Sequence, residues 1–276
     1  MVKMAFPRPT EGVAVLVDLD KCIGCRACQI ACKEWNGRPA EETIFLGELT
    51  NPPTLTANSW KVVFFHEFFT KYISGFEDPY IQPLPYNCLH CAEAPCATSC
   101  PVGAIKVTPE GVVVIEQADC IGCGLCEAAC PFDVPKKGDD GKYYKCTFCV
   151  DRVQSGLEPA CVEVCPTGVF TFGSASEVAS LARKERDRGR VVYGLDIDDY
   201  VGGMTRWIYV ASKNREEALR IHFPEKATVA SNRFREILKP VVKIGSGILA
   251  VALLITGLAS WRRYRILSKQ EEGGGE

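Results

Sequence analysis

The spacing of the cysteines is the feature that most restricts what this chain can fold into. All sixteen fall into four groups of four, and each group ends in Cys-x3-Cys. In chain order, groups one to four are Cys22, Cys25, Cys28 and Cys32; Cys88, Cys91, Cys96 and Cys100; Cys120, Cys123, Cys126 and Cys130; and Cys146, Cys149, Cys161 and Cys165. Four thiolates that converge from a short, bent backbone form the ligand set of a cubane iron-sulfur cluster. The spacing therefore predicts a chain that conducts electrons.

Disulfide scaffolds and structural zinc sites are the two alternative uses of so many cysteines. Disulfide-dense proteins are usually small and secreted, whereas this chain has 276 residues and no recognisable secretory signal. Zinc sites usually pair two Cys-x2-Cys knuckles and rarely place a third cysteine three residues further on. Because the same spacing recurs, it favours iron-sulfur clusters over both alternatives.

The groups also share their surroundings. Asp-Lys-Cys-Ile-Gly-Cys at residues 20–25 resembles Asp-Cys-Ile-Gly-Cys at 119–123, and Cys-Pro-x-Gly begins at both Cys100 and Cys165. Such internal repetition indicates a duplicated cluster-binding unit. A glycine between the first two cysteines would let the backbone approach the cluster and aim its amides at the sulfurs. The long middle gap of group four, residues 150–160, leaves the ligand count unchanged.

The groups are expected to work in pairs. In two-cluster ferredoxins the fourth cysteine of each motif serves the cluster of the other motif. Nineteen residues separate Cys100 from Cys120, enough for one hairpin with strands at 105–107 and 112–115. This favours a nested arrangement, in which groups two and three form an inner module and groups one and four form an outer module around it. The rival arrangement joins group one to two and group three to four, with the 55 residues before Cys88 inside one module.

The charge of the chain bears on its partners and on the clusters. Its formal net charge of -2 omits the clusters, each of which replaces four thiols with four thiolates around a core of about +2. Lysines at 136, 137, 142 and 145 are candidates to offset this negative charge, and a solvated basic loop is the alternative. No broad basic stripe is present, so we expect no nucleic-acid binding.

An uncharged segment lies near the end of the sequence. Residues 244–261 contain no charged side chain, and a helix of this length nearly spans the hydrocarbon core of a bilayer. Trp261 and Tyr264 lie where an aromatic belt is expected. The segment predicts one transmembrane helix over 237–263 and a polar tail at 264–276, with a buried core helix as the alternative. Basic residues on its two sides are balanced, so charge does not fix its orientation.

The sequence contains no recognisable catalytic centre. It has no dinucleotide-binding fingerprint, no Walker loop and no catalytic triad. His90, between Cys88 and Cys91, is expected to be a hydrogen-bonding loop residue, and His66 a packed one. The uncharged segment contains no histidine, so any haem that accepts the electrons is expected in a partner subunit. We therefore expect substrate chemistry to belong to another subunit.

Three stretches around the cysteines carry a family resemblance. They are CIGCRACQIACKEWN at 22–36, YKCTFCVDRV at 144–153 and EPACVEVCPTG at 158–168. They look like the four-cluster iron-sulfur (beta) subunit of membrane-bound formate dehydrogenases, within the wider family of iron-sulfur subunits of molybdopterin oxidoreductases. The resemblance continues at 59–66 and at Gly202 and Gly203, and it covers nearly the whole chain.

The resemblance implies four 4Fe-4S clusters in the nested arrangement, because every ligand position is a cysteine. Carried onto matching positions, the ligand sets are Cys22, Cys25, Cys28 and Cys165; Cys88, Cys91, Cys96 and Cys130; Cys120, Cys123, Cys126 and Cys100; and Cys146, Cys149, Cys161 and Cys32. The first set would hold the cluster nearest the catalytic subunit.

The resemblance also implies partners and a location. Electrons would come from formate oxidised at a molybdenum or tungsten pterin centre in a catalytic alpha subunit. They would leave to a cytochrome b or another quinone-reducing gamma subunit in the membrane. The N-terminal residues contain no export signal of their own, and beta subunits of this family commonly cross with their catalytic partner. That would place the cluster domain on the periplasmic side of the cytoplasmic membrane, and a cytoplasm-facing complex is the alternative.

Together these observations predict an α+β protein. Two ferredoxin-like modules would occupy residues 1–172, with the inner module at about 86–135, followed by a mixed extension at 173–236 and the membrane helix. The same relay role in an oxidoreductase of sulfur compounds, sulfoxides or nitrite, or in a hydrogenase, remains open. A membrane-tethered zinc scaffold without a redox role is the alternative from a different class.

Overall fold

A four-stranded sheet lies at the centre of the described chain. The computed structural model describes residues 7–44, 47–71, 77–197, 199–226 and 256, and residues up to Thr228 form one compact unit. The strands of the sheet, in spatial order, are β8 (Phe170–Ser174), β1 (Val13–Asp18), β10 (Met204–Ala211) and β9 (Val191–Leu195). β1 is parallel to β10 and antiparallel to β8, and β9 is antiparallel to β10.

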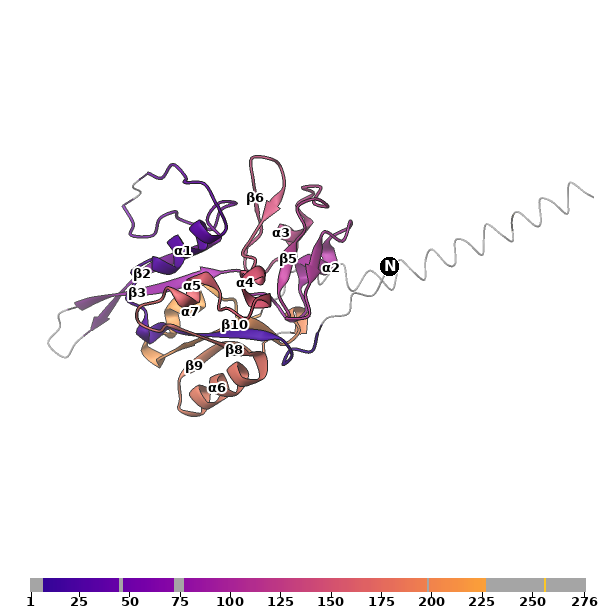
Figure 1. Ribbon diagram of the computed structural model, residues 1–276. Coiled ribbons are helices and arrows are strands. Elements are labelled where there is room, and N and C mark those ends of the chain that lie inside the picture. The colour runs from indigo at the N-terminus through magenta and orange to yellow at the C-terminus, as the bar shows by residue number, and fades with distance from the viewer. Residues whose placement is uncertain (1–6, 45–46, 72–76, 198, 227–255, 257–276) are drawn as a thin grey trace, which may run out of the picture. The chain divides into compact units, whose positions relative to one another are not determined.

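The two faces of this sheet pack against different parts of the chain. Val15 and Val17 of β1 belong to the core that contains the buried cysteines, whereas Ala14 and Leu16 pack into a second core with helix α6 (Ala175–Asp187). Successive side chains of a strand point to opposite faces, so this short strand separates the two cores. Figure 1 shows α6 below the sheet and the cysteine-bearing elements above it. All eight residues of β10 are buried, because both faces of the sheet are covered.

Helix α6 has the sequence features of an amphipathic surface helix. Ser174 accepts a hydrogen bond from the backbone N–H of Glu177, and the Glu177 side chain accepts one from the N–H of Ser174, which is a capping box. Ala175, Val178, Ala179 and Ala182 are buried at the spacing of one helical face. The helix therefore covers the sheet on the side away from the cysteines.

A long antiparallel hairpin forms most of the stretch between groups one and two. Strand β2 (Lys61–Lys71) pairs with β3 (Glu77–Asn87), and Lys61 lies opposite Asn87 where the ladder begins. Helix α7 (Glu216–His222) packs on β3. Figure 1 shows the far end of the hairpin extending away from the sheet, and its near end beside α1.

The remaining elements are short and carry or connect the cysteines. They are η1 (Leu19–Lys21), α1 (Ala27–Trp35), α2 (Pro95–Ser99), β4 (Ile105–Val107), β5 (Val113–Ile115), α3 (Leu125–Ala129), β6 (Lys136–Lys137), β7 (Tyr143–Tyr144), α4 (Val150–Gln154), α5 (Ala160–Glu163), η2 (Asp199–Val201) and η3 (Lys213–Arg215). Strands β4 and β5 pair antiparallel, so the hairpin expected between groups two and three is present.

The segment from 173 onward is part of the same sheet as the N-terminus. The sequence predicts residues 173–236 as a mixed extension that follows the two modules. In the structure, β9 and β10 come from this segment and join β1 and β8 in one sheet. The cluster-bearing region and the described part of the extension therefore share one core.

The expected membrane helix lies almost wholly outside the described residues. Of residues 237–263, only Thr256 is described. Within the part of the chain that the structure describes, no helix is both long and apolar enough to cross a bilayer.

Candidate cluster-binding sites

Each cysteine group places its third member in a short helix. Cys28 lies in α1, Cys96 in α2, Cys126 in α3 and Cys161 in α5. The first two cysteines of each group precede the helix, in turns where several residues have positive φ. Short helices preceded by tight turns bring thiols only three residues apart onto one side of the backbone.

The cysteine-bearing helices pack in two pairs. Helix α1 of group one contacts α5 of group four, and α2 of group two contacts α3 of group three. Trp35, at the end of α1, donates from Nε1 to the Asp151 carboxylate at 3.0 Å, and Thr147 Oγ1 lies 3.2 Å from Asn36 Oδ1. These contacts join group one to group four across more than a hundred residues.

The pairing of β1 with β8 explains how the outer groups meet. Cys22 follows the end of β1 after the short helix η1, and Cys165 precedes the start of β8. Because the strands are antiparallel, with Val17 opposite Phe170, these two ends are adjacent. The N–H of Asp18 also donates to the carbonyl of Val169 at 2.8 Å.

A single cavity at this point is lined by cysteines of both outer groups. Its lining contains Cys22, Cys25, Cys28 and Cys165 together with the apolar side chains of Val63, Pro85, Val169 and Phe170. Four thiols on an apolar cavity fit a cubane cluster, which takes four cysteine ligands and is tuned by how far solvent is excluded.

The effect of one thiol on the pKa of another identifies two further sets of neighbouring thiols. Burial raises the pKa of Cys32 of group one, and the neighbouring thiols Cys146, Cys161 and Cys149 of group four raise it further. Cys130 of group three is influenced by Cys96 and Cys88 of group two, and Cys91 by Cys130. These are the neighbours that the nested ligand sets require. Cys100 directly follows α2, which packs against α3 of group three.

The thiols are spaced more widely than ligands of a single ion. Among the residues that the structure describes, no three His, Cys, Asp or Glu side chains lie close enough to bind one metal ion. A cubane distributes its four cysteine ligands over four separate irons, so thiols around a cluster are expected to lie further apart.

Burial keeps several of these thiols protonated in the metal-free chain. It raises the pKa of Cys28 and Cys126 to about 12 and that of Cys96 and Cys149 to about 11. Metal ligation requires the thiolate, so binding iron must displace these protons.

Backbone amides donate hydrogen bonds to the sulfurs of three cysteines. The N–H of Phe148 donates to Cys146 Sγ at 3.3 Å, and the N–H of Val169 to Cys165 Sγ at 3.4 Å. Gly24 likewise bonds Cys22 through its backbone. Hydrogen bonds to ligand sulfur stabilise negative charge there and are one means by which a protein sets a cluster potential.

The glycines of the Cys-Ile-Gly-Cys turns have a more specific role than general flexibility. Gly24 and Gly122 have φ of +70° and +67°, in the left-handed region that favours glycine. A Cβ on Gly24 would lie 2.6 Å from the Phe65 ring, and one on Gly122 would overlap the carbonyl oxygen of Gly141. On the side where a Cβ would project, both turns are therefore closed against neighbouring residues.

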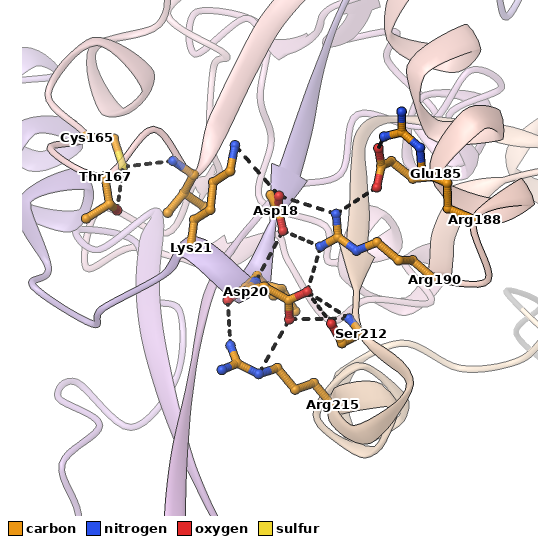
Figure 2. A network of polar contacts seen from close by, with 12 residues as sticks. Asp18, Asp20, Lys21, Cys165, Thr167, Glu185, Arg188, Arg190, Ser212 and Arg215 are labelled. Carbon is orange, nitrogen blue, oxygen red and sulfur yellow. Dashed lines mark hydrogen bonds and ion pairs between the residues drawn. The ribbon is translucent and has the colours of Figure 1, made fainter.

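A network of ion pairs anchors the segment that leads to Cys22 (Figure 2). Arg190, just before β9, pairs with both Asp18 and Asp20, the latter at 2.8 Å. Ser212 donates to Asp20 from its backbone N–H at 3.1 Å and from its hydroxyl at 2.5 Å. The start of group one is thus tied to the residue before β9 and to the residue after β10.

Asp20 is charged in this network at neutral pH. Burial raises its pKa, but the hydrogen bonds from Ser212 and the charges of Arg190 and Arg215 outweigh burial and hold the pKa below its ordinary value. A carboxylate with a lowered pKa stabilises the fold above its unfolded pKa, and this contribution is lost as the pH falls through the lowered value. The anchor therefore weakens only in acid.

Two buried lysines lie among the cysteines, and sequence reasoning found only one of them. Lys145 is 4% exposed and donates to the carbonyls of Val113 and Cys146. Lys61 is 1% exposed and was missed, because lysine in a strand usually indicates a solvent-facing position. Burial lowers the pKa of Lys61, but Cys161, Cys28, Cys146 and Cys32 together raise it above its ordinary value.

The other predicted lysines make surface interactions. Lys136 forms ion pairs with Asp133 and Glu127, and Lys142 donates to the carbonyl of Gln117 at 2.6 Å. Lys137 is exposed.

The histidines occupy packed positions. His90 is fully buried, and its Nδ1 accepts a hydrogen bond from the N–H of Val113 at 3.0 Å. His66 on β2 lies 2.9 Å from His222 of α7, Nε2 to Nε2. Neither His66 nor His90 lines the cavity formed by the outer cysteines.

Comparison with protein families identifies the cysteine-bearing region. Two models, each described as a 4Fe-4S dicluster domain, match residues 21–104 and residues 80–175. The first match contains groups one and two, and the second contains groups two to four. Each matched range contains groups that are neighbours in the sequence. The helix packing, in contrast, joins group one to group four.

Curated proteins with similar sequences cover most of the chain. The formate dehydrogenase iron-sulfur subunit of Haemophilus influenzae is 38% identical over 251 residues, which are 87% of this chain and 78% of that protein. The iron-sulfur subunit of the nitrate-inducible formate dehydrogenase of Escherichia coli is 39% identical over 241 residues, 84% and 80% of the two chains. A sulfite dehydrogenase subunit of Allochromatium vinosum is 36% identical over 191 residues, 63% and 75%.

A methyl group on Gly122 is expected to remove one cluster. Gly122→Ala adds a Cβ against the Gly141 carbonyl at a residue with φ of +67°, so the turn that carries Cys120 and Cys123 must open. Iron analysis of the purified protein should show a loss of about four irons per chain. Gly168→Ala is the control, since its φ is +62° and no atom lies within 4 Å of the added Cβ. Equal iron content in the two variants would contradict this role for the glycine.

Proposed function

The chain belongs to the family of formate dehydrogenase iron-sulfur subunits, and we propose that it relays electrons through four 4Fe-4S clusters from a formate-oxidising molybdopterin subunit to a quinone-reducing membrane subunit. An electron-transfer role through 4Fe-4S clusters is what its relatives and its dicluster domains support. The observation that carries the proposal is the cavity lined by Cys22, Cys25, Cys28 and Cys165, where two distant cysteine groups meet.

The chain would hold the clusters in the nested sets. Three cysteines of each set come from one group, and the fourth comes from its partner group. Bound there, the clusters supply one-electron transfer at potentials that the protein tunes. The chain contributes the thiolates, the amide hydrogen bonds to sulfur, the exclusion of water and the buried positive charges.

We propose that electrons enter at group one, as the family resemblance implies. Cys25 is exposed, and the neighbouring Ile23 is 65% exposed. An apolar side chain beside an exposed ligand suits a protein surface that a partner subunit covers. We assign this face to the molybdopterin subunit, whose metal is molybdenum or tungsten. Cys123 is exposed at the equivalent turn of group three, so the inner module also has a cysteine at the protein surface.

The membrane partner is proposed from two features of the sequence. It rests on the uncharged stretch at 244–261 and on the family resemblance. We propose that this stretch anchors the chain to the cytoplasmic membrane beside a cytochrome b subunit, with the cluster domain on the periplasmic side.

A relay role with a sulfur-compound donor is the second candidate. The sulfite dehydrogenase subunit of Allochromatium vinosum matches 63% of this chain at 36% identity, which is similar in identity to the formate dehydrogenase subunits but shorter in coverage. The cysteine framework therefore does not by itself identify the donor.

Formate is expected to reduce the clusters in the intact complex. The purified complex should contain iron and acid-labile sulfide in the beta chain at about sixteen each on a four-cubane composition. Anaerobic addition of formate should bleach the visible absorption of the clusters and produce the signals of reduced 4Fe-4S centres in electron paramagnetic resonance (EPR).

Two results would redirect this assignment. If sulfite reduces the clusters and formate does not, the chain serves a sulfur-compound oxidoreductase. Zinc without sulfide would remove the electron-transfer role altogether.

Serine replacement of the fourth cysteines tests which groups share a cluster. We expect Cys130→Ser to alter the same EPR signal as Cys91→Ser, and Cys100→Ser to alter the same signal as Cys123→Ser, because each fourth cysteine serves the partner group. The measurement is the difference spectrum of each variant against the wild-type complex. A match of Cys130→Ser with Cys123→Ser would mean that each group binds its own cluster.

A further inference from the structure

Lys61 is a buried lysine whose ammonium group lies against two aromatic rings. Its Nζ lies 4.6 Å from the ring centroid of Phe170 and 4.3 Å from that of Trp207, and it donates to Asn87 Oδ1 at 2.7 Å. The antiparallel register of β2 and β3 places Asn87 directly opposite Lys61. The ammonium group is therefore fixed in position by its strand, its hydrogen bond and both rings.

The positive charge has no carboxylate partner in the part of the chain that the structure describes. Its polar partner is the neutral amide of Asn87, and its strongest electrostatic neighbours are thiols. A buried charge without a countercharge is strongly unfavourable, and the faces of aromatic rings offset only part of that cost. The fold therefore needs negative charge near this site.

The cysteines around Lys61 come from two different ligand sets. The thiols with the greatest electrostatic effect on it are Cys161, Cys28, Cys146 and Cys32. Cys28 belongs to the same ligand set as Cys165. Cys32, Cys146 and Cys161 belong to the other outer set. Both clusters of the outer module would thus face the same ammonium group.

The two rings give independent evidence for this position. Phe170 lines the cavity that also contains Cys22, Cys28 and Cys165. Trp207 packs against Phe148 with ring centroids 5.4 Å apart, and the N–H of Phe148 donates to Cys146 Sγ. Phe170 therefore lies near the ligand set of Cys22, and Trp207 lies near the ligand set of Cys146.

We propose that Lys61 is a shared countercharge for the two clusters of the outer module, and that it raises the reduction potentials of both. Reduction adds one negative charge to a cluster, and a fixed positive charge nearby stabilises the reduced form. Because Lys61 lies in a site from which water is excluded, its charge acts with little screening. This inference rests on the proposed four-cluster relay. It adds a residue that raises the reduction potentials of two of the four clusters.

The test compares Lys61→Met, Lys61→Arg and Lys21→Met in the intact complex. Methionine keeps an unbranched side chain against the rings but removes the charge, and arginine keeps the charge. Lys21 precedes Cys22 in the chain, but its side chain is 53% exposed and pairs with Asp18. It is therefore the control for loss of a solvated charge near the same cluster. Iron content and formate reduction of the wild-type complex are measured first, so failure of the relay is separated from failure of this inference.

Redox titration followed by EPR gives the potential of each cluster. In Lys61→Met we expect the ratio of reduced to oxidised cluster, at a fixed applied potential, to fall about tenfold for both outer clusters, a shift of about 59 mV for a one-electron couple. In Lys61→Met the inner clusters should keep their wild-type potentials. In Lys61→Arg and Lys21→Met all four clusters should keep them.

Each other outcome is also decisive. Unchanged outer potentials in a fully loaded Lys61→Met complex would overturn the proposal, and so would a shift confined to one cluster. If Lys61→Met loses outer-module iron and Lys61→Arg retains it, the charge is required and the proposal stands. Loss of iron in both variants would mean that the position needs the shape of lysine, and the countercharge role would be rejected.

Discussion

The antiparallel pairing of β1 with β8 is the interaction on which the cluster-bearing region depends. It brings the chain entering group one beside the chain leaving group four, although Val17 and Phe170 are separated by most of the sequence. Around this ladder, α1 packs on α5, and the cavity lined by Cys22 and Cys165 forms. The Asp18, Asp20 and Arg190 ion pairs hold the same corner from the other side (Figure 2). If this ladder did not form, two of the four proposed ligand sets would be incomplete.

The electrostatics of the core follow from the same geometry. Thiols in the interior have raised pKa values because burial disfavours their charged form, so they become ligands only when iron compensates the charge. Amide donors such as the N–H of Phe148, and the buried ammonium group of Lys61, supply further compensation. The interior is therefore arranged for a negative cofactor, and an electron added to that cofactor meets positive charge and dipoles already in place.

The sequence predicted the elements that depend on local spacing. The cysteine groups and the 105–115 hairpin follow from local motifs, where neighbouring positions determine the geometry, whereas the short helices that carry the third cysteines were not predicted. The sheet was not predicted, because its four short strands come from distant segments and none identifies its partner by sequence alone. Gly24 and Gly122 were singled out correctly, but their close contacts with Phe65 and Gly141 required the tertiary fold. Lys61 was missed because only its burial, not its residue type, reveals its position.

We propose that the cysteine groups cooperate as nested pairs, one with four and two with three. The most direct measurement is an iron anomalous-difference map from crystals of the intact complex, which locates each cluster without reference to the fold. We expect four separate cubanes in this chain, with Cys165 bound to the cluster of Cys22 and Cys32 bound to the cluster of Cys146. A map in which Cys32 and Cys22 bind the same cluster, or in which group one shares its clusters with group two, would contradict it.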